Sequence, residues 1–441
     1  MKILFISLGC DKNLVDSEVM LGMLSEEGYS FTDDEAEAEA VVVNTCCFIN
    51  DAKEESINTI LEMAELKKSG QIKALIAAGC LAQRYQKEIQ EEIPEVDAIV
   101  GTTAVLDIAE ALDQVLKGKP QNHLEALDKP PAGGRRRVVT TGGYYAYLKI
   151  AEGCDKHCTY CIIPKVRGSY RSIAMEELLK EARALAEGGV KELILVAQET
   201  TLYGVDLYGE KSLPRLLGEL CKISGLTWIR ILYCYPEEIT GELIQVIKKE
   251  PKICHYLDIP VQSGSDRILK KMGRKTDSGQ IKSLIGKLRE EIPDICIRTT
   301  LITGFPGESE EDHEKTMAFV DEMEFDRLGV FTYSPEEGTP AAEMPGQVPE
   351  EVKQIRRNEI MELQQEIAFD MAQNMAGRRV KAMIEGKIEQ EDVYVARTYK
   401  DAPGVDGYLF VNADRNLMSG DFVTVTVTGS NEYDLIGEME D

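Results

Sequence analysis

Aromatic residues and long apolar runs are both scarce in this chain. Phenylalanine, tryptophan and tyrosine make up 6% of its 441 residues, and there is a single tryptophan. The apolar runs, such as residues 40–43 and 74–78, are far shorter than the roughly 20 residues that a membrane-spanning helix needs. Residues 1–12 also lack the small-residue cleavage site of a secretory signal. We therefore expect a cytoplasmic protein with no membrane association.

Positive charge is also in short supply. The chain has 50 Lys and Arg residues against 77 Asp and Glu residues, which gives a formal net charge of -27 at pH 7. Nucleic-acid-binding proteins normally carry a basic face that offsets the charge of the phosphates. The composition therefore argues against a nucleic acid as the direct substrate and favours a basic protein surface as the partner.

Cysteine is present in a pattern that excludes a disulfide framework. Eleven cysteines would suit a small secreted domain, but here they are diluted over a long chain that we expect in a reducing compartment. Grouped cysteines in that setting usually bind metal. Cys154, Cys158 and Cys161, called here the loop cysteines, lie within one short run. Three such thiolates can hold three irons of a 4Fe-4S cluster and leave the fourth iron open to a substrate or cofactor.

Three further cysteines, Cys10, Cys46 and Cys80, follow predicted strands and are called here the strand-end cysteines. Residues 1–119 read as alternating strands and helices, which is typical of a parallel α/β sheet. The spacing predicts strands at residues 2–8, 40–45, 74–78 and 98–101. Because the carboxyl ends of parallel strands share one edge of the sheet, we expect the three thiols to converge there.

The strand-end cysteines also have a simpler interpretation. Buried free cysteines are common at strand ends, where they act as small hydrophobic residues. Three of them in register after successive strands favour a shared cluster instead. Cys47 lies beside Cys46, and adjacent strand residues face opposite ways, so only one of this pair is expected to point into the site. We assign Cys46 as the ligand and keep Cys47 as the alternative.

The length of the chain indicates several domains, since it exceeds what one hydrophobic core usually supports. The predicted fold class is α/β and multidomain, with a parallel N-terminal sheet, an open barrel of six strand-helix repeats and a small C-terminal β-barrel. The predicted boundaries are an N-terminal domain at residues 1–119, a linker at 120–143, the open barrel at 144–349, a connecting helix at 350–375 and the small barrel at 376–441. The strands expected in the open barrel are residues 144–150, 192–197, 228–233, 256–259, 295–301 and 327–331.

The linker contains a run of three arginines, Arg135, Arg136 and Arg137. Such a run could contact an acidic partner or a nucleic acid, but most charge runs simply lie in solvent. We expect these arginines to be solvated.

Polar and glycine residues follow three of the strands expected in the open barrel, at the edge where barrel enzymes place their chemistry. These candidate cofactor contacts are Gln198, Glu199, Gln262, Ser263, Gly304 and Gly307. The two glycines would let the backbone approach a ligand closely. Ordinary turn glycines and polar loop residues are the alternative interpretation for each of them.

The loop cysteines, with Tyr160 before the last of them, resemble the signature of the radical S-adenosylmethionine (radical SAM) superfamily. The upstream motifs Gly-Cys at 9–10, Asn-Thr-Cys at 44–46 and Gly-Cys at 79–80, followed by a terminal β-barrel, narrow the resemblance to the methylthiotransferases. This resemblance covers essentially the whole chain. It implies that the terminal barrel is similar to that family's substrate-binding TRAM module.

Within the methylthiotransferases, the known members chiefly modify tRNA adenosines or an aspartate of ribosomal protein S-twelve, the small-subunit decoding protein. Residues 7–18 (SLGCDKNLVDSE), 163–168 (IPKVRG) and 432–438 (EYDLIGE) resemble the ribosomal-protein branch. The tRNA branch typically has Gln-Met-Asn after its first cysteine. Asp11 stands where the ribosomal-protein branch usually has proline, and Cys47 stands where it usually has a small residue. Neither departure removes a predicted ligand.

The resemblance implies two 4Fe-4S clusters and S-adenosyl-L-methionine as cofactors. The loop cysteines would hold the cluster that binds S-adenosylmethionine, and an electron from a donor such as flavodoxin or ferredoxin would release a 5'-deoxyadenosyl radical. That radical would remove hydrogen from the β-carbon of the target aspartate. The strand-end cysteines would hold the second cluster, whose sulfur is methylated and passed to the carbon radical.

Charge favours the ribosomal-protein branch. Residues 376–441 contain seven Lys and Arg against thirteen Asp and Glu, a net charge of -6, and residues 1–119 carry a net charge of -13. A barrel that grips RNA should be basic. Ribosomal proteins are strongly basic, so an acidic barrel complements them over a screening length of about 8 Å in physiological salt.

Two alternatives stay open at this point. The first is a tRNA adenosine methylthiotransferase with the same mechanism. The second is a non-enzymatic zinc or iron-sulfur protein that uses both cysteine sets for structure.

Overall fold

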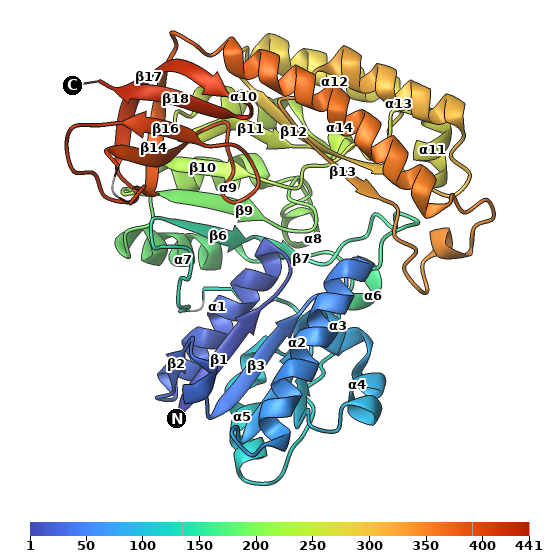
Figure 1. Cartoon of the computed structure of the whole chain (residues 1–441), viewed down its shortest axis with the longest axis vertical. Coiled ribbons are helices and arrows are strands. Elements are labelled where there is room, and N and C mark those ends of the chain that lie inside the picture. The colour runs from blue at the N-terminus through green and yellow to red at the C-terminus, as the bar shows by residue number, and fades with distance from the viewer. Residues whose placement is uncertain (132, 135, 390, 441) are drawn as a thin grey trace.

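A computed structural model describes residues 1–131, 133–134, 136–389 and 391–440. Figure 1 shows an N-terminal sheet with its helices at the bottom of the view, a second sheet above it, and a small barrel at the upper left beside the C-terminus. Within the described residues, no helix is both long enough and apolar enough to cross a bilayer.

The N-terminal part alternates strands and helices, as the spacing predicts. Its elements are β1 (Lys2–Ser7), α1 (Asp11–Glu26), β2 (Ser30–Thr32), β3 (Ala40–Thr45), α2 (Asn50–Lys68), β4 (Ala74–Ala78), α3 (Gly79–Arg84), α4 (Gln86–Glu92), β5 (Ala98–Val100) and α5 (Ile108–Leu116). The short strand β2 is an addition to the predicted set.

The five N-terminal strands form one parallel sheet in the order β2-β1-β3-β4-β5. Strands β3 and β4 are buried at every position, because helices cover both faces of the sheet. Alternate residues of β3 therefore enter different apolar clusters: Val41 and Val43 pack on one face and Val42 on the other. Strands β1, β3 and β4, which precede the strand-end cysteines, are direct neighbours, so their carboxyl ends form one continuous edge.

The central part has the predicted repeat of strands and helices. Its elements are β6 (Tyr145–Lys149), β7 (Ala151–Glu152), α6 (Ile163–Arg167), β8 (Arg171–Ser172), α7 (Met175–Glu187), β9 (Glu192–Val196), α8 (Val205–Tyr208), α9 (Leu213–Cys221), β10 (Trp228–Ile231), α10 (Gly241–Lys249), β11 (Ile253–Asp258), α11 (Asp266–Lys271), α12 (Ser278–Glu291), β12 (Cys296–Thr303), α13 (Glu310–Met323) and β13 (Arg327–Thr332). Six of these strands form a parallel sheet in the order β13-β12-β11-β10-β9-β6. The predicted open parallel arrangement is confirmed.

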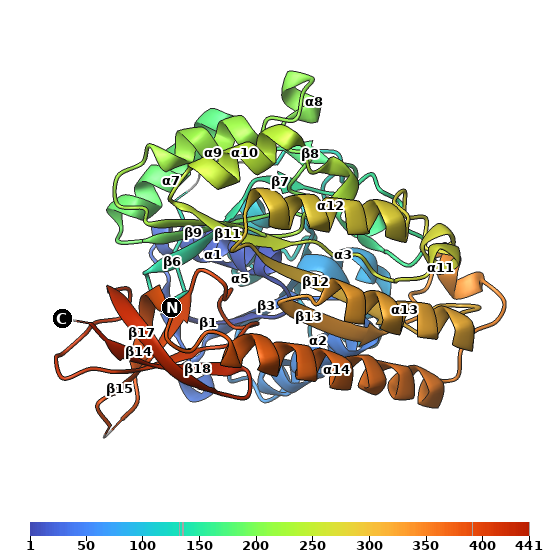
Figure 2. The same ribbon diagram turned by 90° about the horizontal axis from the view of Figure 1, so that it is seen from above.

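The long helix α14 (Glu350–Gln373) packs along α13 and β13 and leads into the barrel (Figure 2). The barrel is closed and consists of β14 (Arg379–Lys387), β15 (Val393–Thr398), β16 (Leu409–Asn412), β17 (Phe422–Asn431) and β18 (Asp434–Met439). In β17 the valines at 423, 425 and 427 are buried while the intervening threonines are more exposed, which is the alternation expected of a small barrel. The strand β18 is an addition to the strands expected from the sequence, and it overlaps the motif at residues 432–438.

Buried ion pairs dock the barrel onto the central sheet. Glu192, at the start of β9, accepts a hydrogen bond from Arg397 of β15 at 2.7 Å, and both side chains are fully buried. Arg298 of β12 pairs with Asp406 of the barrel at 2.9 Å. These pairs join the barrel to the edge of the central sheet.

The expectation that the linker arginines are solvated is wrong for Arg137. Its side chain is buried and forms ion pairs with Glu18 at 3.2 Å and with Glu181 at 3.3 Å. Arg136 is exposed, as expected, and Arg135 lies outside the described residues. The sequence could not show these ion pairs, because the two carboxylates come from α1 and α7, which are both distant from Arg137 in the chain.

Candidate iron-sulfur active site

The strand-end cysteines lie on adjacent loops at the carboxyl edge of the N-terminal sheet. Cys10 directly precedes α1, Cys46 follows β3, and Cys80 lies in the first turn of α3. Gly79 has a φ of +87°, and a Cβ there would lie 2.2 Å from Oδ1 of Asn44. Only glycine fits the turn that presents Cys80.

Asn13 ties these loops together. Its Nδ2 donates to the carbonyl oxygens of Leu8 at 2.6 Å and Thr45 at 3.3 Å, each just ahead of a strand-end cysteine. The hydroxyl of Thr45 then donates to the carbonyl oxygen of Ala78 at 2.6 Å, at the end of β4. The backbones that carry the three cysteines are thereby held in one arrangement, as a shared ligand set requires.

The structure distinguishes Cys46 from its neighbour Cys47. A Cβ on Gly9 would lie 2.9 Å from Sγ of Cys46, so this sulfur is directed toward the loop that carries Cys10. Cys47 packs into an apolar cluster, and the charged groups beside its thiol are Arg84 and Glu336. This arrangement supports Cys46 as the third member of the set, and its role as a ligand stays a prediction.

The loop cysteines lie in a loop that the central part fixes from both sides. The backbone N–H of Cys154 donates to the carbonyl oxygen of Gly168 at 3.1 Å, and that of Thr159 donates to Met272 at 3.0 Å. Burial raises the pKa of Cys154 to about 11 and the pKa of Cys161 to about 12. Both thiols are therefore protonated at neutral pH in the chain by itself, and binding iron would release their protons.

Neither set is arranged for a lone metal ion. Throughout the part of the chain that the structure describes, no group of three or more His, Cys, Asp or Glu side chains could hold one ion. A 4Fe-4S cluster makes a different demand, because each thiolate binds a different iron. Burial and then the other loop cysteines raise the pKa of Cys161, and burial followed by Cys47 and the other strand-end cysteines does the same for Cys80. Three neighbouring thiols are the donors that such a cluster needs from the protein when its fourth iron is left open.

Arg167, at the end of α6, connects the two cysteine sets. Its Nε and Nη2 each lie 3.3 Å from Sγ of Cys80. Its Nη1 donates to Asp16 at 2.7 Å and to Glu152 at 3.1 Å. Because Glu152 and Arg167 flank the loop cysteines in the sequence, while Cys80 and Asp16 belong to the N-terminal part, both sets border one interface.

A second contact crosses the same interface next to Cys10. The hydroxyl of Tyr233 donates to Asp11 at 3.1 Å, and Nζ of Lys12 lies 3.3 Å from the centre of the Tyr233 ring. Tyr233 has a φ of +60°, a strained conformation for a bulky residue, and the backbone is held there by a hydrogen bond to Asp258 at 3.1 Å. Strain of this kind concentrates at functional sites.

Three of the predicted cofactor contacts carry buried oxygens that lack a partner. Within the described chain, Oε1 of Gln198, Oε2 of Glu199 and Oε1 of Gln262 accept no hydrogen bond. Buried polar atoms are rarely left unpaired in folded proteins. Nε2 of Gln198 donates to Glu152 at 2.7 Å, which fixes the direction of the free oxygen. A polar cofactor with amino and hydroxyl groups, such as S-adenosylmethionine, would satisfy these acceptors.

The other predicted contacts have partners within the protein. The Ser263 hydroxyl accepts a hydrogen bond from the backbone of Ser265 at 3.1 Å. A Cβ on Gly304 would lie 2.1 Å from the Lys353 side chain, and a Cβ on Gly307 would lie 2.3 Å from Nζ of Lys271. These neighbouring side chains explain the glycines without a ligand, and the three cofactor contacts stay predictions.

Comparisons with known proteins identify all three parts of this architecture. Residues 2–101 match the uncharacterized protein family UPF0004, residues 148–320 the radical SAM superfamily, and residues 376–439 the TRAM domain. Proteins named ribosomal protein uS12 methylthiotransferase RimO are similar over the whole chain. That of Lachnoclostridium phytofermentans is 63% identical over 440 residues and covers 100% of both chains. The chain belongs to the RimO family. The resemblance to the radical SAM methylthiotransferases is confirmed, and superfamily membership implies one 4Fe-4S cluster and S-adenosylmethionine.

More distant RimO proteins give the same result. The protein of Pelotomaculum thermopropionicum is 51% identical over 444 residues and covers 99% of both chains, and that of Clostridioides difficile is 49% identical over 443 residues and covers 100% of this chain and 99% of its own. Among solved structures, the radical S-adenosylmethionine methyltransferase TsrM from Kitasatospora setae has a TM-score of 0.58 at 14% identity, over 77% of this chain and 76% of its own. That likeness concerns the fold alone.

Glu199 gives the cofactor-free RimO chain an unusual dependence on pH. Burial raises the pKa of its carboxyl to about 7, against the nearby Thr201 hydroxyl and Lys156, which lower it. The folded state therefore binds a proton that the unfolded state releases near pH 4.5, so this group makes the free energy of unfolding fall as pH rises toward 7.

We expect Glu199→Gln to remove this dependence. The variant should gain stability relative to the parent as pH rises from 5 to 8, by up to about 3 kcal/mol, since one pKa unit corresponds to about 1.4 kcal/mol. Urea unfolding of both cofactor-free chains at several pH values measures the difference. Equal slopes for the two chains would contradict the assignment.

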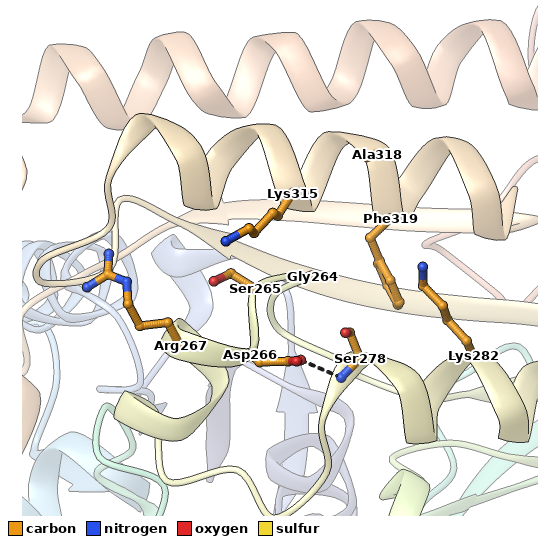
Figure 3. A pocket seen from close by; sticks show the side chains of 9 residues that line it. All are labelled: Gly264, Ser265, Asp266, Arg267, Ser278, Lys282, Lys315, Ala318 and Phe319. Atoms are coloured by element: carbon orange, nitrogen blue, oxygen red, sulfur yellow. Dashed lines mark hydrogen bonds between the residues drawn. The ribbon is translucent and has the colours of Figure 1, made fainter.

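A surface pocket of about 360 Å³ lies apart from both cysteine sets, between α11, α12 and α13 (Figure 3). Its lining includes Gly264, Ser265 and Phe319 and three cations. The cations are already paired, Arg267 with Asp312, Lys282 with Glu322 and Lys315 with Glu311. The pocket contains no cysteine, so none of the predicted cluster ligands lies in it.

Proposed function

We propose that this chain transfers a methylthio group to the β-carbon of an aspartate in uS12, the S-twelve protein of the small ribosomal subunit, by radical SAM chemistry. The whole-chain relatives named above are uS12 methylthiotransferases. The observation that carries the proposal is the shared interface, where Arg167 contacts Cys80 on one side and Glu152 on the other. The radical source and the sulfur donor have to face one cavity, and this arrangement permits it.

The loop cysteines Cys154, Cys158 and Cys161 hold the cluster of the radical SAM part in this proposal. The strand-end cysteines Cys10, Cys46 and Cys80 hold a second 4Fe-4S cluster in the N-terminal part. In both sets three thiols are available, which leaves one iron of each cluster free of protein ligands. The support is the neighbouring thiols of each set, which are buried apart from the exposed Cys10 and the half-buried Cys161.

When bound, S-adenosylmethionine and its cluster supply a radical that can take hydrogen from an unactivated carbon, which no side-chain base removes as a proton near neutral pH. The residues of the chain bind and orient the cofactor. Gln198 and Gln262 offer buried acceptors from the segments that follow β9 and β11, and Glu199 adds a carboxyl beside Lys156.

The domain limits belong to this proposal as well. The second-cluster domain comprises residues 1–119, the linker 120–143, the radical SAM domain 144–349, the connecting helix 350–375 and the TRAM domain 376–441.

The partners follow from charge and chemistry. The TRAM domain carries a net charge of -6, which complements a basic ribosomal protein and would repel tRNA. Cleavage of S-adenosylmethionine also needs one electron from a low-potential donor such as flavodoxin or ferredoxin. A ribosomal substrate places the enzyme in the cytoplasm.

Mass spectrometry tests this proposal directly. The chain, reconstituted with iron and sulfide without oxygen, is incubated with S-adenosylmethionine, a reductant and either small ribosomal subunits or tRNA. We expect a uS12 peptide heavier by one methylthio group, and unmodified adenosine in tRNA. Modified adenosine together with unmodified uS12 would favour the tRNA enzyme instead. Zinc without iron in the purified chain would contradict both.

A further inference from the structure

The buried guanidinium of Arg167 has more contacts than domain docking requires. All five of its N–H groups have acceptors, and two of the five contacts are to one sulfur atom. The side chain is 2% exposed. An arginine that only joined two domains would direct its donors to carboxylates, which are the stronger acceptors. Arg167 divides them between carboxylates and the thiol of Cys80.

Three other residues hold the guanidinium beside Cys80. Asp16 and Glu152 bind its Nη1, and Oδ1 of Asn13 binds its Nη2 at 3.1 Å. Asn13 is also the side chain that ties the cysteine loops together. The position of Arg167 and the positions of the strand-end cysteines are therefore set by the same residues.

The same network reaches the cofactor side of the interface. Glu152 accepts from Arg167 at 3.1 Å and from Nε2 of Gln198 at 2.7 Å, and Lys149 pairs with Glu152 at 2.8 Å. The chain of contacts from Cys80 to Gln198 thus passes through two buried side chains, Arg167 and Glu152. A cation held this rigidly acts on the sulfur with little solvent screening.

We propose that Arg167 is a positioning residue of the sulfur-donor site: it fixes the Cys80 thiolate by two N–H···S bonds and thereby raises the reduction potential of the second cluster. Hydrogen bonds and positive charge at a ligand sulfur stabilise the reduced, more negative form of an iron-sulfur cluster. This inference rests on the proposed function, because it needs a second cluster. It assigns a role to the motif at residues 163–168, which neither the cofactor contacts nor the ligand sets had used.

The test is a redox titration followed by electron paramagnetic resonance on the full-length, reconstituted chain. The parent, Arg167→Gln and Arg167→Lys are compared. The signal that remains in Cys154→Ala, which lacks one loop cysteine, is assigned to the second cluster. We expect Arg167→Gln to make reduction of the second cluster at least about tenfold less favourable, a shift of about 59 mV to lower potential for one electron. Arg167→Lys, which keeps the charge but not the fork of donors, should shift it less. The potential of the first cluster should not change.

Arg171→Lys is the matched control. Arg171 is also buried, but its Nη1 donates at 2.7 Å to the carbonyl oxygen of Ser169 and its Nη2 donates at 3.0 Å to that of Arg167, and neither bond is to a sulfur. This variant should leave both potentials in place. Asp16→Asn is a second, independent test for the case that Arg167→Gln fails to fold. This variant leaves Arg167 beside Cys80 but removes a negative charge that neutralises the guanidinium. It should therefore raise the potential of the second cluster.

The iron content distinguishes failure of the role proposed for Arg167 from failure of the proposed function. Two clusters with an unchanged second potential in Arg167→Gln, or in Asp16→Asn where only that variant folds, would overturn the role of Arg167 and leave the proposed function intact. A parent chain with only four irons and one signal would instead contradict the proposed function.

Discussion

Replacing Cys154 with alanine should reduce both 5'-deoxyadenosine release and methylthio transfer to the background measured without enzyme. Cys154 is one of the three thiols of this loop, and the only histidine of the loop, His157, is exposed. Loss of one of three ligands prevents stable assembly of a cluster that already lacks a fourth. Chromatography of the nucleoside product and mass spectrometry of uS12 measure the two effects.

The strand-end cysteines should give a different result. Cys46→Ala is expected to keep S-adenosylmethionine cleavage and to lose methylthio transfer, because only the sulfur donor is affected. Cys47→Ala should keep both activities. The reverse result for this pair would show that Cys47, not Cys46, is the ligand. Cys254→Ala is the matched control, since Cys254 is buried in an apolar cluster between the central sheet and the barrel and belongs to neither set.

The sequence predicted the cysteine sets because their spacing reports local geometry. Each strand-end cysteine follows an apolar, β-branched or alanine-rich strand, and parallel strands of that kind share one edge. In the structure β1, β3 and β4 are direct neighbours in the sheet, an order that the sequence alone could not establish. Periodicity likewise placed the six strands of the central sheet and the long helix α14.

The sequence could not predict contacts between distant segments, because residue spacing reports local geometry only. Arg167 and Arg137 read as ordinary cations in the sequence, and only the fold brings Asp16, Cys80 and Glu18 against them. The glycines at 304 and 307 stay predicted cofactor contacts, although their positive φ and crowded Cβ positions also follow from protein neighbours. The strand β18 was overlooked because its short apolar pattern follows directly on the turn after β17.

Replacing Glu192 with alanine should cost the folded protein about 3–5 kcal/mol, the usual penalty for leaving a buried charge without its partner. Oε1 of Glu192 accepts from Arg230 at 2.8 Å, Oε2 accepts from Arg397 at 2.7 Å, and all three side chains are fully buried. Burial alone would raise the pKa of Glu192, but the two guanidiniums lower it overall. The stabilisation is therefore present above the carboxyl's ordinary pKa and is lost as pH falls below it.

Glu192 joins two parts of the molecule, so its loss should also loosen the TRAM domain from the central sheet. Limited proteolysis is expected to cut Glu192→Ala between α14 and β14 under conditions that leave the parent intact. Glu192→Gln retains an acceptor oxygen, so its rate of cleavage should lie between those of the parent and of Glu192→Ala. Glu311→Ala, which removes an exposed pair with Lys315, should unfold at the same temperature as the parent. Unchanged stability and protease resistance in Glu192→Ala would mean that apolar contacts such as Trp228 with Phe422, rather than the buried charges, hold the two parts together.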